Sequence, residues 1–195
     1  TVATQQLASA QAALKADPDC VPALMIVGEG DAQAGRINEA RRSFERILER
    51  FPQFTPALRS LVLLPESNSD EKAAYELNLK ARRALPRDPL VALAAGRALF
   101  KRGDFAAAKL PLREAVETLK ENADAAYYYG MALYRLGDKK QALGYLSRAK
   151  ELGLRADLEG EVVKLLLESG FSNQSKLSTE SSELKTDSPL PGPPP

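Results

Sequence analysis

The sequence predicts an all-α protein, an array of antiparallel helix hairpins with about ten helices in total. Apolar residues recur at helical spacing through most of the chain, as in Ala40, Phe44 and Ile47. No long stretch shows the alternation of apolar and polar residues that is typical of half-buried strands. Proline and glycine interrupt the chain about every 12 to 20 residues, which predicts short helices joined by tight turns.

A repeat of 34 residues orders these helices. Glycines at positions 28, 96 and 130 are each followed seven residues later by a second glycine, at positions 35, 103 and 137. The first glycine of each pair should let the two helices of one unit approach to within about 8–10 Å. The sequence predicts four units, 21–54, 55–88, 89–122 and 123–156, and predicts that residues 1–20 form the second half of a preceding unit.

Local signals predict where helices begin and end. The pairs Gly103-Asp104 and Gly137-Asp138 indicate a glycine that ends one helix and an aspartate that caps the next. Thr55-Pro56 and Asp88-Pro89 indicate a capping residue followed by a first-turn proline. Pro111 falls inside a predicted helix, which we expect to kink without breaking.

The unit at residues 55–88 is predicted to be the least regular. Pro65 should end its first helix at about Leu64, which leaves Glu66–Asp70 as a longer loop and a possible hinge. Val62 stands where other units carry a small residue, and Asn78 stands where an apolar residue is normal.

The end of the chain changes in character. A helix at residues 157–170 is predicted to cap the last hairpin, with Gly170 at its end. Residues 171–195 are rich in serine and finish in a proline-rich stretch, which predicts a flexible tail. We interpret this tail as a linker; the alternative is that its prolines dock into an aromatic groove.

The composition argues against catalysis and against several classes of ligand. The chain has no histidine and a single cysteine, Cys20, so we expect no enzyme, no metal site and no cofactor. The net charge of +1 argues against nucleic-acid binding. The longest apolar runs are far shorter than the roughly 20 residues of a membrane-spanning helix, so no membrane insertion is expected.

The start of the chain bears on its origin. It begins at Thr1, without methionine and without a signal-like segment, so we interpret it as a processed chain or a fragment. We expect a soluble protein of the cytoplasm or periplasm, and the sequence itself does not distinguish these compartments.

The period and the residue pattern resemble the tetratricopeptide repeat family. Residues 123–156 match best, with Tyr129-Gly130, Leu133, Gly137-Asp138 and Ala142 at signature places. The family's usual tryptophan is absent, and its place is filled by leucine or alanine. The resemblance implies a right-handed superhelical solenoid in which the first helix of each unit lines a concave groove for a peptide or protein segment.

The resemblance also implies where groove residues lie. By register they are Met25, Glu29 and Gln33 in the first unit, Arg59, Leu63 and Glu66 in the second, Leu93, Arg97, Phe100 and Lys101 in the third, and Tyr127, Tyr128, Met131, Tyr134 and Arg135 in the fourth. Five of the six tyrosines lie between residues 127 and 145, and tyrosine with arginine is typical of binding hot spots. The alternative is that these residues are ordinary solvated or packing positions.

Three adjacent tyrosines span too much of a helix to face one core. Tyr129 is predicted to be mostly core, Tyr127 to line the groove, and Tyr128 to lie at its edge or against the neighbouring unit. The basic residues in the later part of the groove favour a partner with an acidic or C-terminal carboxylate end. Met25 and Glu29 stand where some chaperone-docking members hold such a carboxylate, so that specific partner class is not expected.

These features favour a non-catalytic adaptor or scaffold that binds a peptide or protein segment. The alternative is a structural segment of a larger protein, or one that self-associates through a face or an edge. Nucleic-acid binding by a helical-repeat array is disfavoured by the charge balance.

Overall fold

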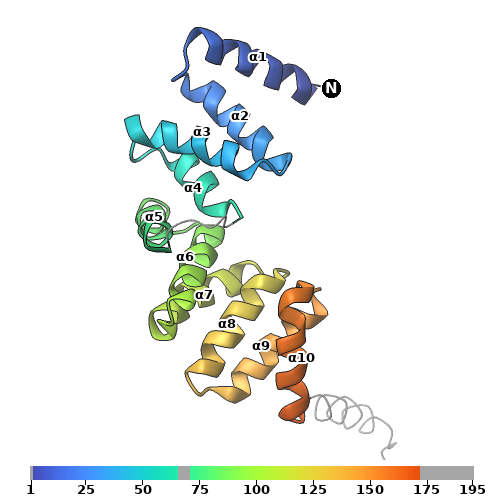
Figure 1. The fold of residues 1–195 in the computed structure, drawn as a ribbon. Helices are drawn as coiled ribbons and strands as arrows, with labels where there is room; N and C mark the ends of the chain where they lie inside the picture. Colours follow the sequence, from blue (N-terminus) through green and yellow to red (C-terminus); the bar gives the residue numbers. More distant parts are fainter. Residues whose placement is uncertain (1, 66–70, 172–195) are drawn as a thin grey trace, which may run out of the picture. The chain divides into compact units, whose positions relative to one another are not determined.

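The computed structural model describes residues 2–65 and 71–171, which form ten helices and no strand (Figure 1). The all-α prediction and the expected number of helices are confirmed. The chain divides into two parts, Thr1–Lys120 and Glu121–Pro195, and each is described by itself.

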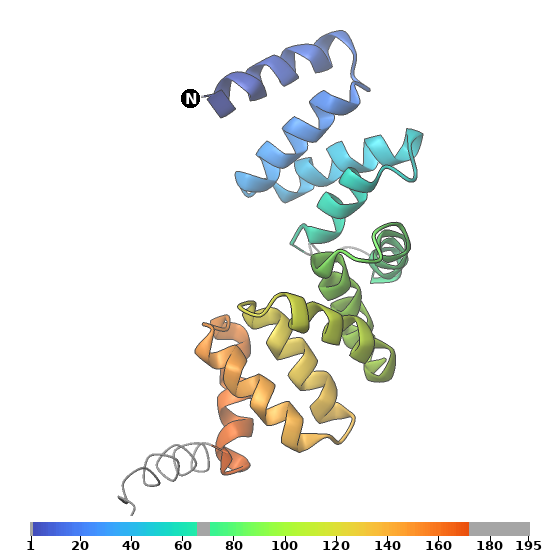
Figure 2. The ribbon, with the colours of Figure 1, turned by 180° about the vertical axis from the view of Figure 1, so that it is seen from behind.

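The N-terminal part is a run of seven helices in which each packs against the next. They are α1 (Val2–Ala16), α2 (Val21–Gln33), α3 (Ile37–Arg50), α4 (Thr55–Leu63), α5 (Glu71–Ala84), α6 (Pro89–Lys101) and α7 (Phe105–Thr118). Helix α4 also contacts α6 directly. Figure 2 shows the same succession from behind.

The C-terminal part has three helices, α8 (Ala123–Arg135), α9 (Lys139–Glu151) and α10 (Ala156–Glu168). Helix α9 packs against both α8 and α10. Helix α10 buries Val162 and Leu166, and it is followed by Gly170 at a φ of 67°. The predicted closing helix is therefore present and begins one residue earlier than expected. The tail was predicted at 171–195, and all of it except Phe171 lies outside the described residues.

Glycines in the left-handed conformation end the first helices of several hairpins. Gly103 has a φ of 78° and Gly137 a φ of 89°, a region that favours glycine because it has no Cβ. Asp104 then caps α7 by accepting a hydrogen bond from the Ala107 amide at 3.0 Å, and Asp138 caps α9 in the same way. Both glycine–aspartate signals are confirmed.

Asp88 fixes the start of α6. Its carboxylate accepts hydrogen bonds from the amides of Leu90 at 2.9 Å and Val91 at 3.1 Å, and from Arg59 Nε of α4 at 2.5 Å. Burial works to raise the pKa of this carboxyl, but these hydrogen bonds outweigh it and hold the pKa below its usual value. The predicted Thr55 cap, by contrast, is wrong: Phe54 occupies the N-cap of α4 and Thr55 is already helical.

Glycines also allow the paired helices to approach closely. A Cβ added at Gly96 of α6 would lie 2.5 Å from Leu112 Cγ of α7, and one added at Gly28 of α2 would lie 2.7 Å from the Phe44 ring of α3. Leu112 and Phe44 are fully buried. The large side chain of one helix therefore fills the space that glycine leaves on the other.

The unit at 55–88 departs from the others in the length of its first helix. Helix α4 has 9 residues, whereas α2, α6 and α8 have 13 each. It ends at Leu63, as Pro65 predicted, and the loop expected at 66–70 lies outside the described residues. Pro111 does not break α7, which runs through it, as expected.

We expect Gly96→Ala to destabilise the protein by about 1–3 kcal/mol, because the added methyl overlaps the buried Leu112 side chain. Gly144 is a matched control, since a Cβ at this helical glycine would meet no atom within 4 Å. Gly144→Ala should stabilise by about 0.5–1 kcal/mol through helix propensity. Urea unfolding followed by circular dichroism measures both, and a Gly96→Ala variant as stable as the wild type would contradict the packing.

The Asp88–Arg59 ion pair predicts a pH-dependent contribution to stability. Asp88→Asn keeps a capping side chain but removes the charge, so the wild type should be more stable at pH 7 by at most about 1 kcal/mol. Because the folded pKa of Asp88 is lowered, this advantage is present above the unfolded pKa of about 3.9 and lost as the pH falls through the folded value. Thermal unfolding between pH 7 and pH 2 should show the two curves converge; a constant offset would argue against the pair.

Candidate functional site

The groove candidates of α2 and α4 differ in exposure. Met25 is half-buried and packs against the core around Phe44, whereas Glu29 and Gln33 are more accessible. Leu63 is 36% exposed at the end of α4. Glu66 lies outside the described residues.

Arg59 is exposed and takes part in an ion pair. Its guanidinium forms the ion pair with Asp88 that links α4 to the start of α6. Its side chain is 44% accessible, so the pair contributes little energy, but it fixes the direction in which Arg59 points. The structure therefore gives Arg59 a connecting role that the register did not indicate.

The four groove candidates on α6 differ in how deeply they are buried. Leu93 is buried, Arg97 and Phe100 are half-buried, and Lys101 is exposed. The Phe100 ring meets the Phe105 ring of α7 edge to face, with centroids 5.1 Å apart. Arg97 and Lys101 follow one another by one helical turn, so they lie on the same side of α6.

The three adjacent tyrosines of α8 are all buried, which corrects the expectation that Tyr127 lines an open surface. Tyr129 packs edge to face on Tyr145 of α9, with ring centroids 4.8 Å apart. This contact agrees with the prediction that Tyr129 belongs mostly to the core. Tyr127 is only 4% exposed, and its ring meets that of Tyr128 at 5.0 Å. Met131 is buried as well.

The hydroxyl of Tyr127 has a hydrogen-bond partner although the side chain is buried. It donates a hydrogen bond to Glu161 Oε2 of α10 at 3.2 Å. Burial raises the pKa of the Tyr127 phenol, and the Glu161 carboxylate raises it further, so the group stays protonated and remains a donor. Because Tyr127 bonds to α10 and Tyr129 packs on α9, nearby tyrosines of one helix are buried against different partners.

Tyr134 and Arg135 are the accessible candidates of the C-terminal part. Arg135 is exposed and Tyr134 half-buried, at the end of α8. Lys139 Nζ of α9 lies 5.8 Å from the centre of the Tyr134 ring, within the range of a cation–π contact.

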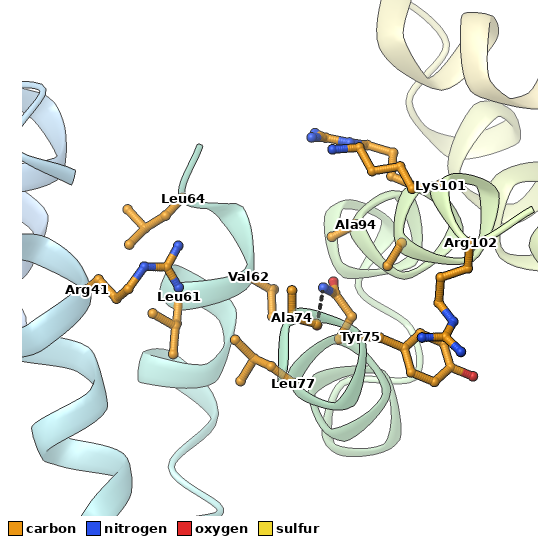
Figure 3. Close-up of a pocket in the computed structure, with 13 residues that line it drawn as sticks. Arg41, Leu61, Val62, Leu64, Ala74, Tyr75, Leu77, Ala94, Lys101 and Arg102 are labelled. Atoms are coloured by element: carbon orange, nitrogen blue, oxygen red, sulfur yellow. Dashed lines mark hydrogen bonds between the residues drawn. The ribbon is translucent and has the colours of Figure 1, made fainter. Parts of the chain in front are cut away.

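A cavity of about 90 Å³ lies in the N-terminal part between α3, α4, α5 and α6 (Figure 3). Its lining residues are Arg41, Leu61, Val62, Leu64, Ala74, Tyr75, Leu77, Asn78, Ala94, Arg97, Ala98, Lys101 and Arg102. Sequence reasoning missed this cavity. Two signals pointed to it, because Pro65 shortens α4 and Asn78 replaces an apolar residue.

The cavity is apolar in its walls and basic in its charge. Four of its described lining residues carry a positive charge, and no described lining residue carries a negative charge. Among the atoms of these lining residues, Arg41 Nε and Asn78 Oδ1 are buried and have no hydrogen-bond partner among the described residues. The guanidinium of Arg102 lies over the Tyr75 ring at 4.5 Å, as the two labelled side chains in Figure 3 show.

Over residues 2–65 and 71–171, no group of three or more histidine, cysteine, aspartate or glutamate side chains could hold a metal ion. No helix in this part of the chain is long and apolar enough to cross a membrane.

Two stretches of the sequence match family models. Residues 4–53 and residues 93–156 each match a model described as tetratricopeptide repeat, and together they cover more than half of the chain. No match was found among curated protein sequences.

Solved structures of tetratricopeptide repeat proteins share the fold. A crystal structure of MamA has a TM-score of 0.62 at 19% identity, over 75% of this chain and 80% of that chain. YrrB, described as a TPR protein with an unusual peptide-binding site, has a TM-score of 0.66 at 20% identity, over 83% and 84%. A thermophilic TPR protein of Thermus thermophilus has a TM-score of 0.55 at 20% identity, over 83% and 89%.

The buried Tyr127 hydroxyl predicts a measurable contribution to stability. Tyr127→Phe should destabilise the C-terminal part by about 1–2 kcal/mol, because Glu161 loses its donor. Tyr134→Phe is the matched control on the same helix and should change stability by less than about 0.5 kcal/mol. Thermal unfolding measured by tyrosine near-ultraviolet circular dichroism compares the two; equal effects would show that the Tyr127 bond contributes nothing particular.

Proposed function

The chain belongs to the tetratricopeptide repeat family, and on that premise we propose that it is a non-catalytic adaptor or scaffold that binds a peptide or protein segment. The observation that carries the proposal is the array of helix hairpins whose first helices present accessible apolar and charged side chains. An array of this kind exposes long helical faces instead of enclosing a single core. YrrB, which shares the fold, is described as having a peptide-binding site, and this supports the same class of function here.

The accessible groove candidates are the residues we assign to binding. In the N-terminal part they are Glu29, Gln33, Leu63, Arg97, Phe100 and Lys101, and in the C-terminal part they are Tyr134 and Arg135. Each part offers its own surface. We propose that the four units at 21–54, 55–88, 89–122 and 123–156 remain the functional divisions of the chain.

The charge of α6 indicates the character of the partner. Arg97, Lys101 and Arg102 lie within six residues, and α6 has no acidic residue. A partner segment with acidic side chains or a terminal carboxylate, together with a few apolar side chains, complements this surface.

Self-association is the second candidate function, and one observation favours it. Leu167 of α10 is 68% exposed, on the last described helix of the C-terminal part. A contact with another copy, or with further residues of a longer chain, would remove the apolar surface of this leucine from water. Light scattering over a concentration series distinguishes this function from peptide binding. Self-association requires the average molecular mass to rise with protein concentration in the absence of any added peptide.

Selection from a random dodecapeptide library on the immobilised full chain tests peptide binding. We expect enriched peptides that carry acidic and apolar residues, and we expect Lys101→Glu to weaken their binding about tenfold, or about 1.4 kcal/mol. Lys109→Glu makes the same charge change on an exposed residue of α7 and should leave binding unchanged. A library without any enriched peptide, or equal losses in both variants, would contradict the proposal.

A further inference from the structure

We propose that two copies of this chain associate head to tail, with α10 of one copy lying in a groove between α1 and α2 of the other. This inference rests on the proposed self-association and names the two surfaces that meet. Each surface lies within a single part of the chain, so each is described by itself.

The groove runs along one side of α1 and α2, which pack against each other (Figure 1). Its volume is about 440 Å³. The lining residues are Val2, Gln5, Gln6, Ser9, Ala10, Ala13, Cys20, Pro22, Ala23 and Ile26. All of these side chains are uncharged, and most of them are small or apolar. The groove therefore suits the apolar stripe of an amphipathic helix.

Ile26 shows that the groove is open where a helix would normally cover it. Ile26, Tyr128 and Val162 hold the same position in the 34-residue repeat. Val162 is 0% exposed and Tyr128 is 6% exposed, whereas Ile26 is 39% exposed. In the C-terminal part, Tyr127 of α8 reaches Glu161 of α10, so one first helix lies beside the next. Among the described residues, no first helix lies beside α2 in this way on the side of α1.

Helix α10 has the opposite open face. In the preceding unit, Gly130 of α8 lies against Leu146 of α9, and Leu133 on the same side of α8 is 1% exposed. Leu167 holds the position of Leu133 one repeat later and is 68% exposed. A Cβ added at Gly160 would meet no atom within 4 Å. The open stripe of α10 consists of Gly160, Val163, Lys164 and Leu167.

The two open faces correspond to the two halves of one hairpin. Helix α10 holds the register of a first helix, and α1 holds the register of a second helix. In the hairpins of α2, α6 and α8, a glycine of the first helix lies against a large side chain of the second. The same two positions are Lys164 in α10 and Ala10 in α1, so the large and the small residue are exchanged. The methylene groups of Lys164 can lie over Ala10 while the ammonium group stays in water.

The charges of the two helices favour this pairing. Because the helices of a hairpin are antiparallel, the start of α10 would lie beside the end of α1. Asp157 and Glu159 stand in the first turn of α10, and Lys15 stands in the last turn of α1. Helix α1 has no acidic residue, and in the turn that follows it Asp19 is already paired with two arginines of α3. Opposite charges at this end of the contact fix the orientation of α10 in the groove.

A second copy accounts for both surfaces with one contact. The α10 stripe and the groove differ from each other, so their contact is heterologous and each copy keeps one of the two surfaces for a further copy. The contact removes Leu167 of one copy and Ile26 of the other from water.

Sedimentation velocity of the full chain at increasing concentration tests the proposal. We expect association with a dissociation constant on the order of 100 μM. Leu167→Glu and Ser9→Glu should each weaken it at least tenfold, because each places a carboxylate in the contact. Leu110→Glu changes another exposed leucine, and Gln11→Glu changes an exposed residue of α1 outside the groove, so both should associate like the wild type. Circular dichroism checks that all four variants fold.

A mixture of the two disrupted variants distinguishes a head-to-tail contact from a symmetric one. The Leu167→Glu chain keeps its groove, and the Ser9→Glu chain keeps its α10 stripe. An equimolar mixture should therefore form a complex of one chain of each kind, with an affinity close to that of the wild type. A mixture that stays monomeric although the wild type associates would overturn the proposal.

The same measurements distinguish the docking from self-association in general. A wild-type chain that associates, together with a folded Ser9→Glu variant that associates equally well, would overturn the docking in the groove and leave self-association intact. A wild-type chain that stays monomeric at every concentration would overturn both.

Discussion

The contact between a glycine of one helix and a large buried side chain of the next is the constraint on which the rest of the structure depends. Gly28 meets Phe44, Gly96 meets Leu112, and Gly130 meets Leu146. Each pair fixes how closely two helices of a hairpin approach. Once this spacing is set, the positions along each helix divide into those that face a partner and those that do not, and the accessible side chains follow from that division.

The unit at 55–88 lacks this contact, and its irregularity has a physical cause. Val62 of α4 stands at the place of the glycine. The hairpin of α4 and α5 therefore has a branched side chain where the other hairpins have no side chain. Helix α4 is also the shortest of the ten described helices. The cavity lined by basic residues therefore lies at the unit that departs most from the repeat pattern. In a fold made of similar units, such a departure can give one position a chemistry that the others lack.

Much of the fold could be predicted from the sequence, because its signals are local. Gly103, Asp104 and Pro65 act on neighbouring residues, and each has the expected effect. Burial could not be predicted so well, because it depends on distant residues. Tyr127 is buried, and its hydroxyl donates a hydrogen bond to Glu161, which lies 34 residues away in the sequence. The cavity depends on side chains from four helices, and their meeting is not visible in any short stretch, although Asn78 marked one of its walls.

The short α4 has a consequence for how such a chain can vary over time. Helix α5 begins 34 residues after α3, and α6 begins 34 residues after α4, so the lost helical turn leaves the spacing of the following helices unchanged. A single proline can therefore change where one helix ends while every later unit keeps its register in the 34-residue repeat. Because the register is kept, a substitution that shortens α4 acts through the contacts of this helix with α3, α5 and α6, and not through the spacing of the repeat.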